Sequence, residues 1–126
     1  MPDHSKPDHH KPGHHKIDYV EFASADPAAT RAFFAATFGW QFEEYDAYLA
    51  FHGTGLDGGI YQADLANRTD TGGALIVFYS DDLVATERLL RQHGARIVKP
   101  VFSFPGGRRF HFTEPAGNEF AVWSAA

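Results

Sequence analysis

Residues 16–126 repeat one pattern of secondary structure twice, and this repeat constrains the fold more than any other feature. In the first copy, a strand rich in aromatic and β-branched residues at 17–23 leads into a helix, which Asp26 caps and Gly39 ends. Short strands separated by turns are then expected at residues 40–45, 48–52 and 59–62.

A polar, turn-forming linker at residues 63–72 precedes the second copy. A buried strand at 74–79 leads into a helix that we expect Asp81 to cap and Gly94 to end, with the same spacing as in the first copy. Further strands are expected at residues 97–102, 109–113 and 119–124.

The repeat limits how each half can be stabilised. A single sheet covered by one helix leaves much of its apolar surface exposed, so one half is marginal alone. Two such halves side by side predict an α+β fold. Its two βαβββ modules form a curved mixed sheet around a cleft, with the helices outside. The cleft is the expected binding site.

Residues 1–15 precede this domain and form a segment rich in His, Lys and Pro. Because it has almost no apolar side chains to bury, we expect a flexible tail followed by a domain at 16–126. Neutral imidazoles can bind nickel, zinc or copper, and the candidates are His9, His10, His14 and His15. Two readings stay open, namely adventitious metal affinity of a solvated tail and a physiological metal-binding arm.

Composition excludes several classes of function. The formal charge is −5 with acids and bases interspersed, which argues against a nucleic-acid surface. No apolar run approaches the ~20 residues that span a bilayer, and the N-terminus lacks the apolar segment of a secretory signal. Cysteine is absent, which excludes disulfides and favours a cytoplasmic protein.

Several short motifs, in this order, resemble the vicinal oxygen chelate superfamily, the group of glyoxalase I, bleomycin-resistance proteins and extradiol dioxygenases. They are Asp26-Pro27, Phe33-Phe34, Phe38-Gly39-Trp40, Gly58-Gly59, Gly106-Gly107, the segment 114–118 and Val122-Trp123. The resemblance covers about residues 16–124 and is greatest to small bacterial members described as related to lactoylglutathione lyase. It implies paired βαβββ modules, commonly in homodimers.

Metal-using members of that superfamily place ligands on the inward faces of four strands. The resemblance puts these positions at Tyr19, at Gln62 or Tyr61, at Leu75 or Ala74, and at Ala121. Leucine and alanine cannot bind a cation, and a catalytic metal needs several converging ligands. We therefore expect no metal cofactor in the cleft.

Other residues are candidates for binding or catalysis. Glu21, buried among aromatic rings, would be a general base, and a half-exposed carboxylate paired with a cation is the alternative. His111, between two phenylalanines on a strand, is either a structural histidine or an acid–base group. The residues expected to line the cleft are Tyr19, Glu21, Gln62, Leu75, Tyr79, Arg109, Ala121 and Trp123.

The segment 103–109 is interpreted as a flexible loop with two arginines. Its glycine pair lacks the strand-to-helix context of a phosphate-binding loop, so we interpret Gly106-Gly107 as a turn. Arg109 either binds an anionic group of a ligand or is solvated.

Three functions follow as hypotheses. The first is a metal-independent protein that binds a small aromatic or amphipathic molecule in its cleft. The second is a lyase- or isomerase-type enzyme that uses Glu21, His111 or a displaced metal. The third is a metal-handling module that acts through the histidine-rich tail. In each case we expect a homodimer and no nucleic-acid or membrane partner.

Overall fold

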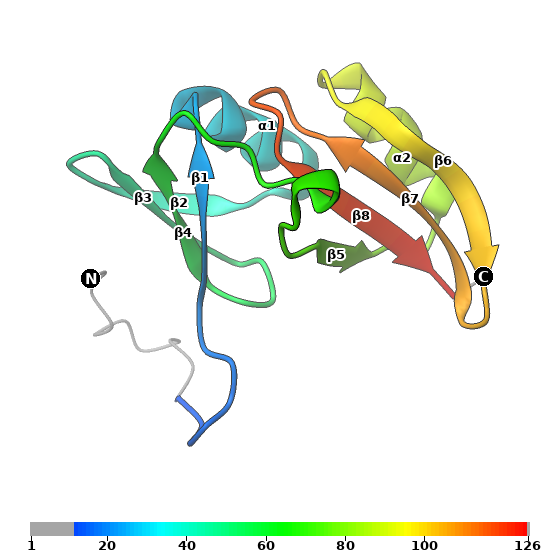
Figure 1. Cartoon of the computed structure of the whole chain (residues 1–126), viewed down its shortest axis with the longest axis horizontal. Helices are drawn as coiled ribbons and strands as arrows, with labels where there is room; N and C mark the ends of the chain where they lie inside the picture. The colour runs from blue at the N-terminus through cyan, green and yellow to red at the C-terminus, as the bar shows by residue number, and fades with distance from the viewer. Residues whose placement is uncertain (1–11, 126) are drawn as a thin grey trace.

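The computed structural model describes residues 12–125, and it contains two βαβββ modules in succession (Figure 1). The elements of the first module are β1 (Val20–Ser24), α1 (Pro27–Phe38), β2 (Gln41–Tyr45), β3 (Tyr48–His52) and β4 (Gly58–Gln62). Its strands form a sheet, here sheet A, in the order β1-β4-β3-β2. Strand β1 runs parallel to β4, and the other neighbours are antiparallel.

The second module follows the same plan. Its elements are β5 (Ile76–Tyr79), α2 (Leu83–Gln92), β6 (Arg96–Phe104), β7 (Gly107–Thr113) and β8 (Glu119–Ser124). They form sheet B in the order β5-β8-β7-β6, with β5 parallel to β8. A short 3-10 helix, η1 (Thr69–Thr71), lies in the linker between the modules. The predicted α+β fold is confirmed, and within residues 12–125 the strands form two four-stranded sheets instead of one.

The two modules also match in their side chains where each first strand enters its helix. A serine hydroxyl accepts a hydrogen bond from the backbone of the capping aspartate and contacts a threonine hydroxyl in the helix. These residues are Ser24, Asp26 and Thr30 in the first module and Ser80, Asp82 and Thr86 in the second. The repeat seen in the sequence is thus a repeat of local hydrogen bonding.

The predicted cap of the second helix is wrong by one residue. Asp82, not Asp81, accepts the hydrogen bond that caps α2, from the backbone N–H of Ala85 at 3.1 Å. Two adjacent aspartates carry the same capping chemistry, so the sequence alone does not distinguish them. The loop predicted at 103–109 is also wrong, because Ser103 pairs with Arg108 across a tight β6–β7 hairpin.

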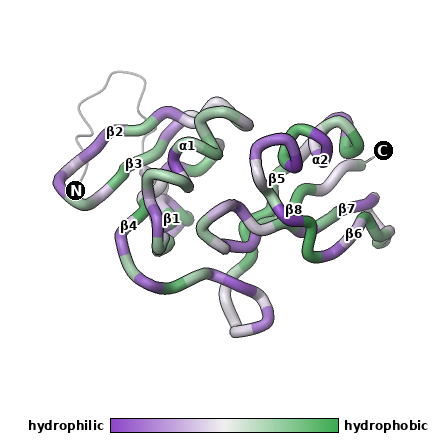
Figure 2. The backbone as a smooth tube through the Cα atoms, turned by 90° about the horizontal axis from the view of Figure 1, so that it is seen from above, coloured by the Kyte–Doolittle hydropathy of each residue, from purple (hydrophilic) through white to green (hydrophobic). Residues whose placement is uncertain are grey.

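One hydrophobic core joins the modules. Helix α1 lies between the strands of the first module and the second module (Figure 2). Its Phe33 and Phe34 rings lie 6.0 Å from Phe112 and 5.1 Å from Phe120 of sheet B. From β1, the Phe22 ring meets Phe120 edge-on at 5.5 Å. The core therefore covers one face of each sheet, and we call the opposite face the helix-free face.

A buried asparagine also joins the modules. Asn118, which is fully buried, donates from Nδ2 to the Ala23 carbonyl of β1 and to the Glu114 carboxyl. Its Oδ1 accepts from the backbone N–H of Asn67 in the linker. Thr30 of α1 donates to the same Glu114 carboxyl. Burial raises the pKa of Glu114, against the hydrogen bonds that it accepts.

Replacement of Asn118 by alanine should weaken the joint between the modules. The change removes one hydrogen bond each from the Ala23 carbonyl, the Asn67 N–H and the Glu114 carboxyl, so we expect the free energy of unfolding to fall by about 2–4 kcal/mol. Urea denaturation followed by fluorescence measures this. Asn67→Ala is the matched control, because its side chain makes one exposed hydrogen bond and should cost less than about 1 kcal/mol. Equal losses for the two variants would contradict the assignment.

Candidate functional site

The helix-free face of sheet B carries a group of polar and aromatic side chains. Strand β7 alternates between the two faces, so that Phe110 and Phe112 enter the core while Arg109 and His111 lie on the helix-free face. The cross-strand register with β8 places three more residues on the same face, namely Glu119, Ala121 and Trp123.

His111 and Glu119 form a buried pair. The distance between His111 Nδ1 and Glu119 Oε2 is 2.8 Å, and the two side chains are 2% and 5% exposed. Thr69 of η1 donates to the same carboxylate from its backbone N–H and its hydroxyl. Burial alone raises the pKa of Glu119, but the hydrogen bonds from His111 and Thr69 outweigh it, so the pKa lies below its ordinary value. Glu119 is therefore ionised at neutral pH.

This pairing fixes the orientation of the His111 ring. An ionised carboxylate only accepts hydrogen bonds, so His111 Nδ1 carries a hydrogen. The other ring nitrogen, Nε2, is buried and has no hydrogen-bond partner among residues 12–125. A carboxylate that holds one imidazole nitrogen leaves the other oriented for a ligand or a proton. Nε2 is thus the ring nitrogen of this pair that is left without a partner.

Arg109 lies two residues away on the same face. Its Cζ is 5.2 Å from the centroid of the Phe102 ring and 5.8 Å from that of Phe104, which is cation–π geometry. Arg109 Nε is buried and, in the described part of the chain, also has no hydrogen-bond partner. The Phe102 ring lies 5.9 Å from the His111 ring as well. One aromatic ring therefore contacts both polar side chains.

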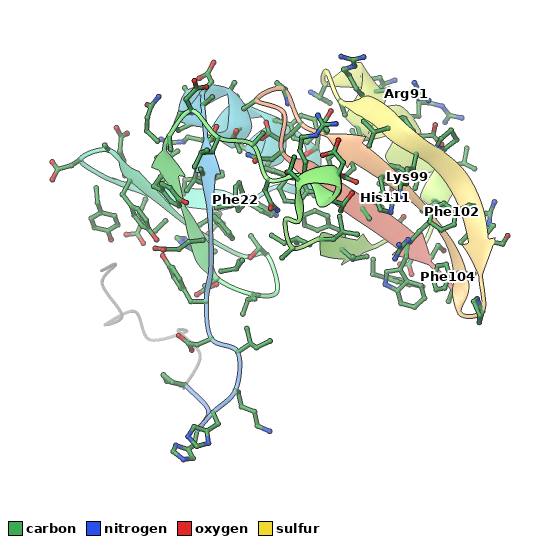
Figure 3. All side chains as sticks on the ribbon, viewed as in Figure 1. Phe22, Arg91, Lys99, Phe102, Phe104 and His111 are labelled. Atoms are coloured by element: carbon green, nitrogen blue, oxygen red, sulfur yellow. The ribbon has the colours of Figure 1, made fainter. Side chains whose placement is uncertain are left out.

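The aromatic surface extends from β6 across the sheet. Trp123 of β8 lies 6.2 Å from the Phe104 ring and 5.0 Å from the Tyr79 ring of β5. Figure 3 shows Phe102, Phe104 and His111 together with Lys99 on the sheet B side of the molecule. Tyr79 and Phe102 are 53% and 37% exposed, so this surface can meet a ligand without unfolding the core.

A second polar group lies on the helix-free face of sheet A. Tyr19 and Tyr48 share a hydrogen bond of 2.6 Å between their hydroxyls, and Tyr48 donates to Glu21 Oε2 at 2.7 Å. Burial raises the pKa of Tyr48, and the hydrogen bonds with Tyr19 and Glu21 raise it further. The Tyr48 hydroxyl lies over Gly59, where an added Cβ would be 1.8 Å away. Only glycine leaves room for the phenol there.

A pocket of about 360 Å³ lies where β1 and β4 meet the linker and the start of β5. Glu21 and Tyr61 contribute from sheet A, and Asn67, Thr71 and Ile76 contribute from the linker and β5. The linker therefore lines this pocket and also donates a hydrogen bond to Glu119 through Thr69.

The structure groups the residues predicted from the sequence into separate places. Arg109, His111, Ala121, Trp123 and Tyr79 share the helix-free face of sheet B. Tyr19 and Glu21 share that of sheet A, where Glu21 is exposed and accepts a hydrogen bond from Tyr48.

Two predicted residues lie apart from these groups. Gln62 Nε2 donates to the Ala25 carbonyl, and Gln62 lines a different pocket, between α1 and the β2–β3 hairpin. Leu75 is partly buried and precedes β5.

These groups also contain residues that are not predicted from the sequence. Tyr48, Thr69, Phe102 and Phe104 were not among the candidates. The alternation of Phe102 and Phe104 was a usable signal, but it depends on the β6–β7 hairpin that was interpreted as a loop. Thr69 gave no signal, because its contact with Glu119 depends on how the linker folds.

The tail candidates are only partly within the structure. His9 and His10 lie outside the described residues. His14 and His15 are exposed, and their rings stack at 3.8 Å.

A family model for the Glyoxalase/Bleomycin resistance protein/Dioxygenase superfamily matches residues 16–122. The chain therefore belongs to this superfamily, as the resemblance in its motifs implied. A search of curated proteins gives no significant match.

Solved structures with the same fold come from several bacteria. A glyoxalase/bleomycin resistance protein/dioxygenase family enzyme from Burkholderia phytofirmans is 15% identical, with a TM-score of 0.72, over 87% of this chain and 100% of that one. The fosfomycin resistance protein FosX from Listeria monocytogenes is 17% identical, with a TM-score of 0.72, over 88% and 93%.

A lactoylglutathione lyase from Agrobacterium tumefaciens is 18% identical, with a TM-score of 0.66, over 90% of this chain and 96% of that one. At these identities the likeness shows the fold. Among residues 12–125, no helix has the length and apolar character needed to cross a bilayer.

The residues at the implied metal-ligand positions do not fit a metal. Leu75 and Ala121 have no donor atom, the Tyr19 hydroxyl is hydrogen-bonded within its own cluster, and Gln62 lies in another pocket. Residues 12–125 contain no group of three or more His, Cys, Asp or Glu side chains that could hold a metal ion.

Glu119 should make the stability of the protein depend on pH. Its pKa is lower in the folded than in the unfolded chain, so its contribution is present above the unfolded value and is lost as pH falls through the folded value. Denaturation measured between pH 7 and pH 2.5 should show that the free energy of unfolding falls less on acidification for Glu119→Gln than for the wild type. Glu87→Gln, which removes a surface ion pair, is the control and should retain the wild-type profile.

Proposed function

We propose that this protein binds a small aromatic or amphipathic molecule on the surface between and over its two sheets, without the divalent metal that other members of the superfamily use. One observation carries the proposal: the metal-ligand positions hold Leu75 and Ala121, while exposed aromatic rings surround the remaining polar groups. An apolar site with a few oriented polar groups is the usual form of a small-molecule site.

The exposed rings support this proposal. Tyr61, Tyr79 and Phe102 are between 37% and 53% exposed and lie beside the pocket or on the helix-free face. Exposed aromatic side chains that gather near polar groups are typical of binding surfaces, because a ligand that covers them removes apolar area from water.

The similar structures support a small molecule as the ligand, but they do not identify it. One of them is a fosfomycin resistance protein and another a lactoylglutathione lyase, so this fold serves proteins that act on unrelated small molecules. Fold alone does not determine function. The ligand of this chain therefore depends on its own residues.

Metal content tests the metal-free part of the proposal. A full-length variant with the five tail histidines replaced by glutamine should contain only traces of metal after growth in medium with nickel, zinc and iron. The replaced residues are His4, His9, His10, His14 and His15. Elemental analysis that finds close to one ion per chain in this variant would refute the proposal. Equal metal in the variant and the wild type would also reject a metal-binding tail.

Ligand binding tests the other part. In buffer with EDTA, a thermal-shift screen of aromatic acids, amines and alcohols should raise the melting temperature, because a ligand of the folded state stabilises it. Tyr79→Ala should reduce the shift. Val84→Ala, on the exposed side of α2, is the control for a lost surface side chain. A flat response over the whole screen would count against binding.

A second candidate function is an enzyme, favoured by the geometry of His111. With Glu119 holding Nδ1, the Nε2 atom can take a proton from a substrate carbon and return it to a neighbouring carbon. The test is formation of lactoylglutathione from methylglyoxal and glutathione in EDTA. A rate above the uncatalysed reaction that is lost in His111→Gln and kept in His52→Gln would favour the enzyme.

We also propose that the chain forms a homodimer in the cytoplasm, since dimers are common in the superfamily. Light scattering should then give twice the chain mass of 14.0 kDa.

A further inference from the structure

Two buried nitrogen atoms on the helix-free face of sheet B have no hydrogen-bond partner among residues 12–125. They are Nε2 of His111 and Nε of Arg109. Both side chains come from β7, two residues apart, so they point to the same face. Because a buried polar atom without a partner is destabilising, such atoms are rare and need an explanation.

The existing contacts of Arg109 do not satisfy its Nε–H. Phe102 and Phe104 lie against the guanidinium group within 6 Å and attract its charge. The N–H bonds of a guanidinium group lie in its plane, and they need acceptors at that edge. The rings hold Arg109 in place while its Nε–H lacks an acceptor, and a preorganised anion site has a fixed donor of this kind.

His111 can complete such a site in either protonation state. If the ring is charged, Nε2–H donates to an anionic oxygen. If the ring is neutral, Nε2 accepts from the O–H that a phosphonate keeps as its monoanion, whereas a carboxylate has no O–H and binds the charged ring. In both cases one proton lies between Nε2 and a ligand oxygen, and Glu119 holds the ring from the other side.

The charges around the two nitrogens favour an anion. Lys99 of β6 lies opposite His111 in the strand register, and Arg109 is two residues along β7. Glu119 is the acidic side chain paired with His111, and its carboxylate is turned toward Thr69 and Nδ1 of His111. This part of the surface is therefore basic in a chain whose formal charge is −5.

We propose that Arg109 and His111 form a subsite for the carboxylate or phosphonate group of a planar aromatic acid, whose ring packs against Phe102, Phe104 and Trp123. This inference rests on the proposed function and narrows its ligand class to aromatic anions. The acid group bridges the two nitrogens across the edge of Phe102, the ring that contacts both side chains. The aromatic part of the ligand covers the exposed surface beside it.

Binding of phenylphosphonate and benzoate to the full chain tests this subsite. Isothermal titration calorimetry in EDTA at pH 7 should give one site for each probe. Benzyl alcohol, which has the ring without the charge, should bind at least about 10-fold more weakly, because a charge-assisted hydrogen bond contributes about 1.5–3 kcal/mol. Acetate, which has the charge without the ring, should also bind more weakly.

Variants of neighbouring arginines separate the subsite from general charge effects. Arg109→Gln should weaken phenylphosphonate at least about 10-fold. Arg108→Gln removes the same charge from the other face of β7 and should leave the affinity within about 2-fold. Arg109→Lys keeps the charge and the packing, and should give an intermediate affinity because lysine lacks the planar fork. Circular dichroism of each variant verifies the fold.

NMR tests the contact between His111 Nε2 and the ligand directly. The His111 side-chain ¹⁵N resonances should shift when phenylphosphonate is added, whereas those of His52 and His93 should stay unchanged. This measurement needs no substitution, so it also decides the matter if Arg109→Gln does not fold.

Each outcome bears on the subsite. Equal affinity for benzyl alcohol and benzoate would overturn it while leaving the proposed binding function in place. Equal losses in Arg108→Gln and Arg109→Gln, or an unchanged His111 spectrum, would overturn it too. If none of the probes binds, the subsite is refuted, and the thermal-shift screen then decides the proposed function independently.

Discussion

The structure depends on a buried hydrogen-bond network centred on Asn118. This side chain ties the first strand, the linker and the Glu114 turn together, and Thr30 attaches α1 to the same carboxyl. Apolar contacts such as those of Phe120 bury surface area but are not directional. The hydrogen bonds are directional, so they fix the orientation of one module relative to the other. The shape of every surface that spans the modules, including the pocket at β1, therefore depends on the Asn118 network.

The fold was readable from the sequence because its signals are local. A capping aspartate, a closing glycine and alternating apolar residues each act within a few positions, and their recurrence revealed the two modules. Errors arose where neighbours are chemically equivalent, as with Asp81 and Asp82, or where a turn was taken for a loop, as at 103–109. In that segment a hairpin places Phe102 opposite Arg109, and only the register reveals this.

The site was less readable because its contacts cross between elements. His111 was a candidate, but its pairing with Glu119 and Thr69 joins β7, β8 and the linker. Tyr48 reaches Glu21 only because Gly59 leaves space beneath its ring. The resemblance to the superfamily supplied the ligand positions, and the sequence then indicated which of them hold residues without a donor atom, namely Leu75 and Ala121. The sequence could not indicate which polar atoms remain without partners, since that needs three-dimensional packing.

The linker between the modules has a further consequence. Its backbone amides at Asn67 and Thr69 donate to Asn118 and Glu119, and neighbouring residues line the pocket at β1. The pocket and the His111–Glu119 pair thus both contact the same short segment. Local opening of the linker must break both sets of contacts. A ligand in the pocket at β1 would therefore lower the population of the open linker, and this would also stabilise the contact of Thr69 with Glu119. The pocket at β1 and the His111–Glu119 pair are therefore connected through the linker, which belongs to neither module.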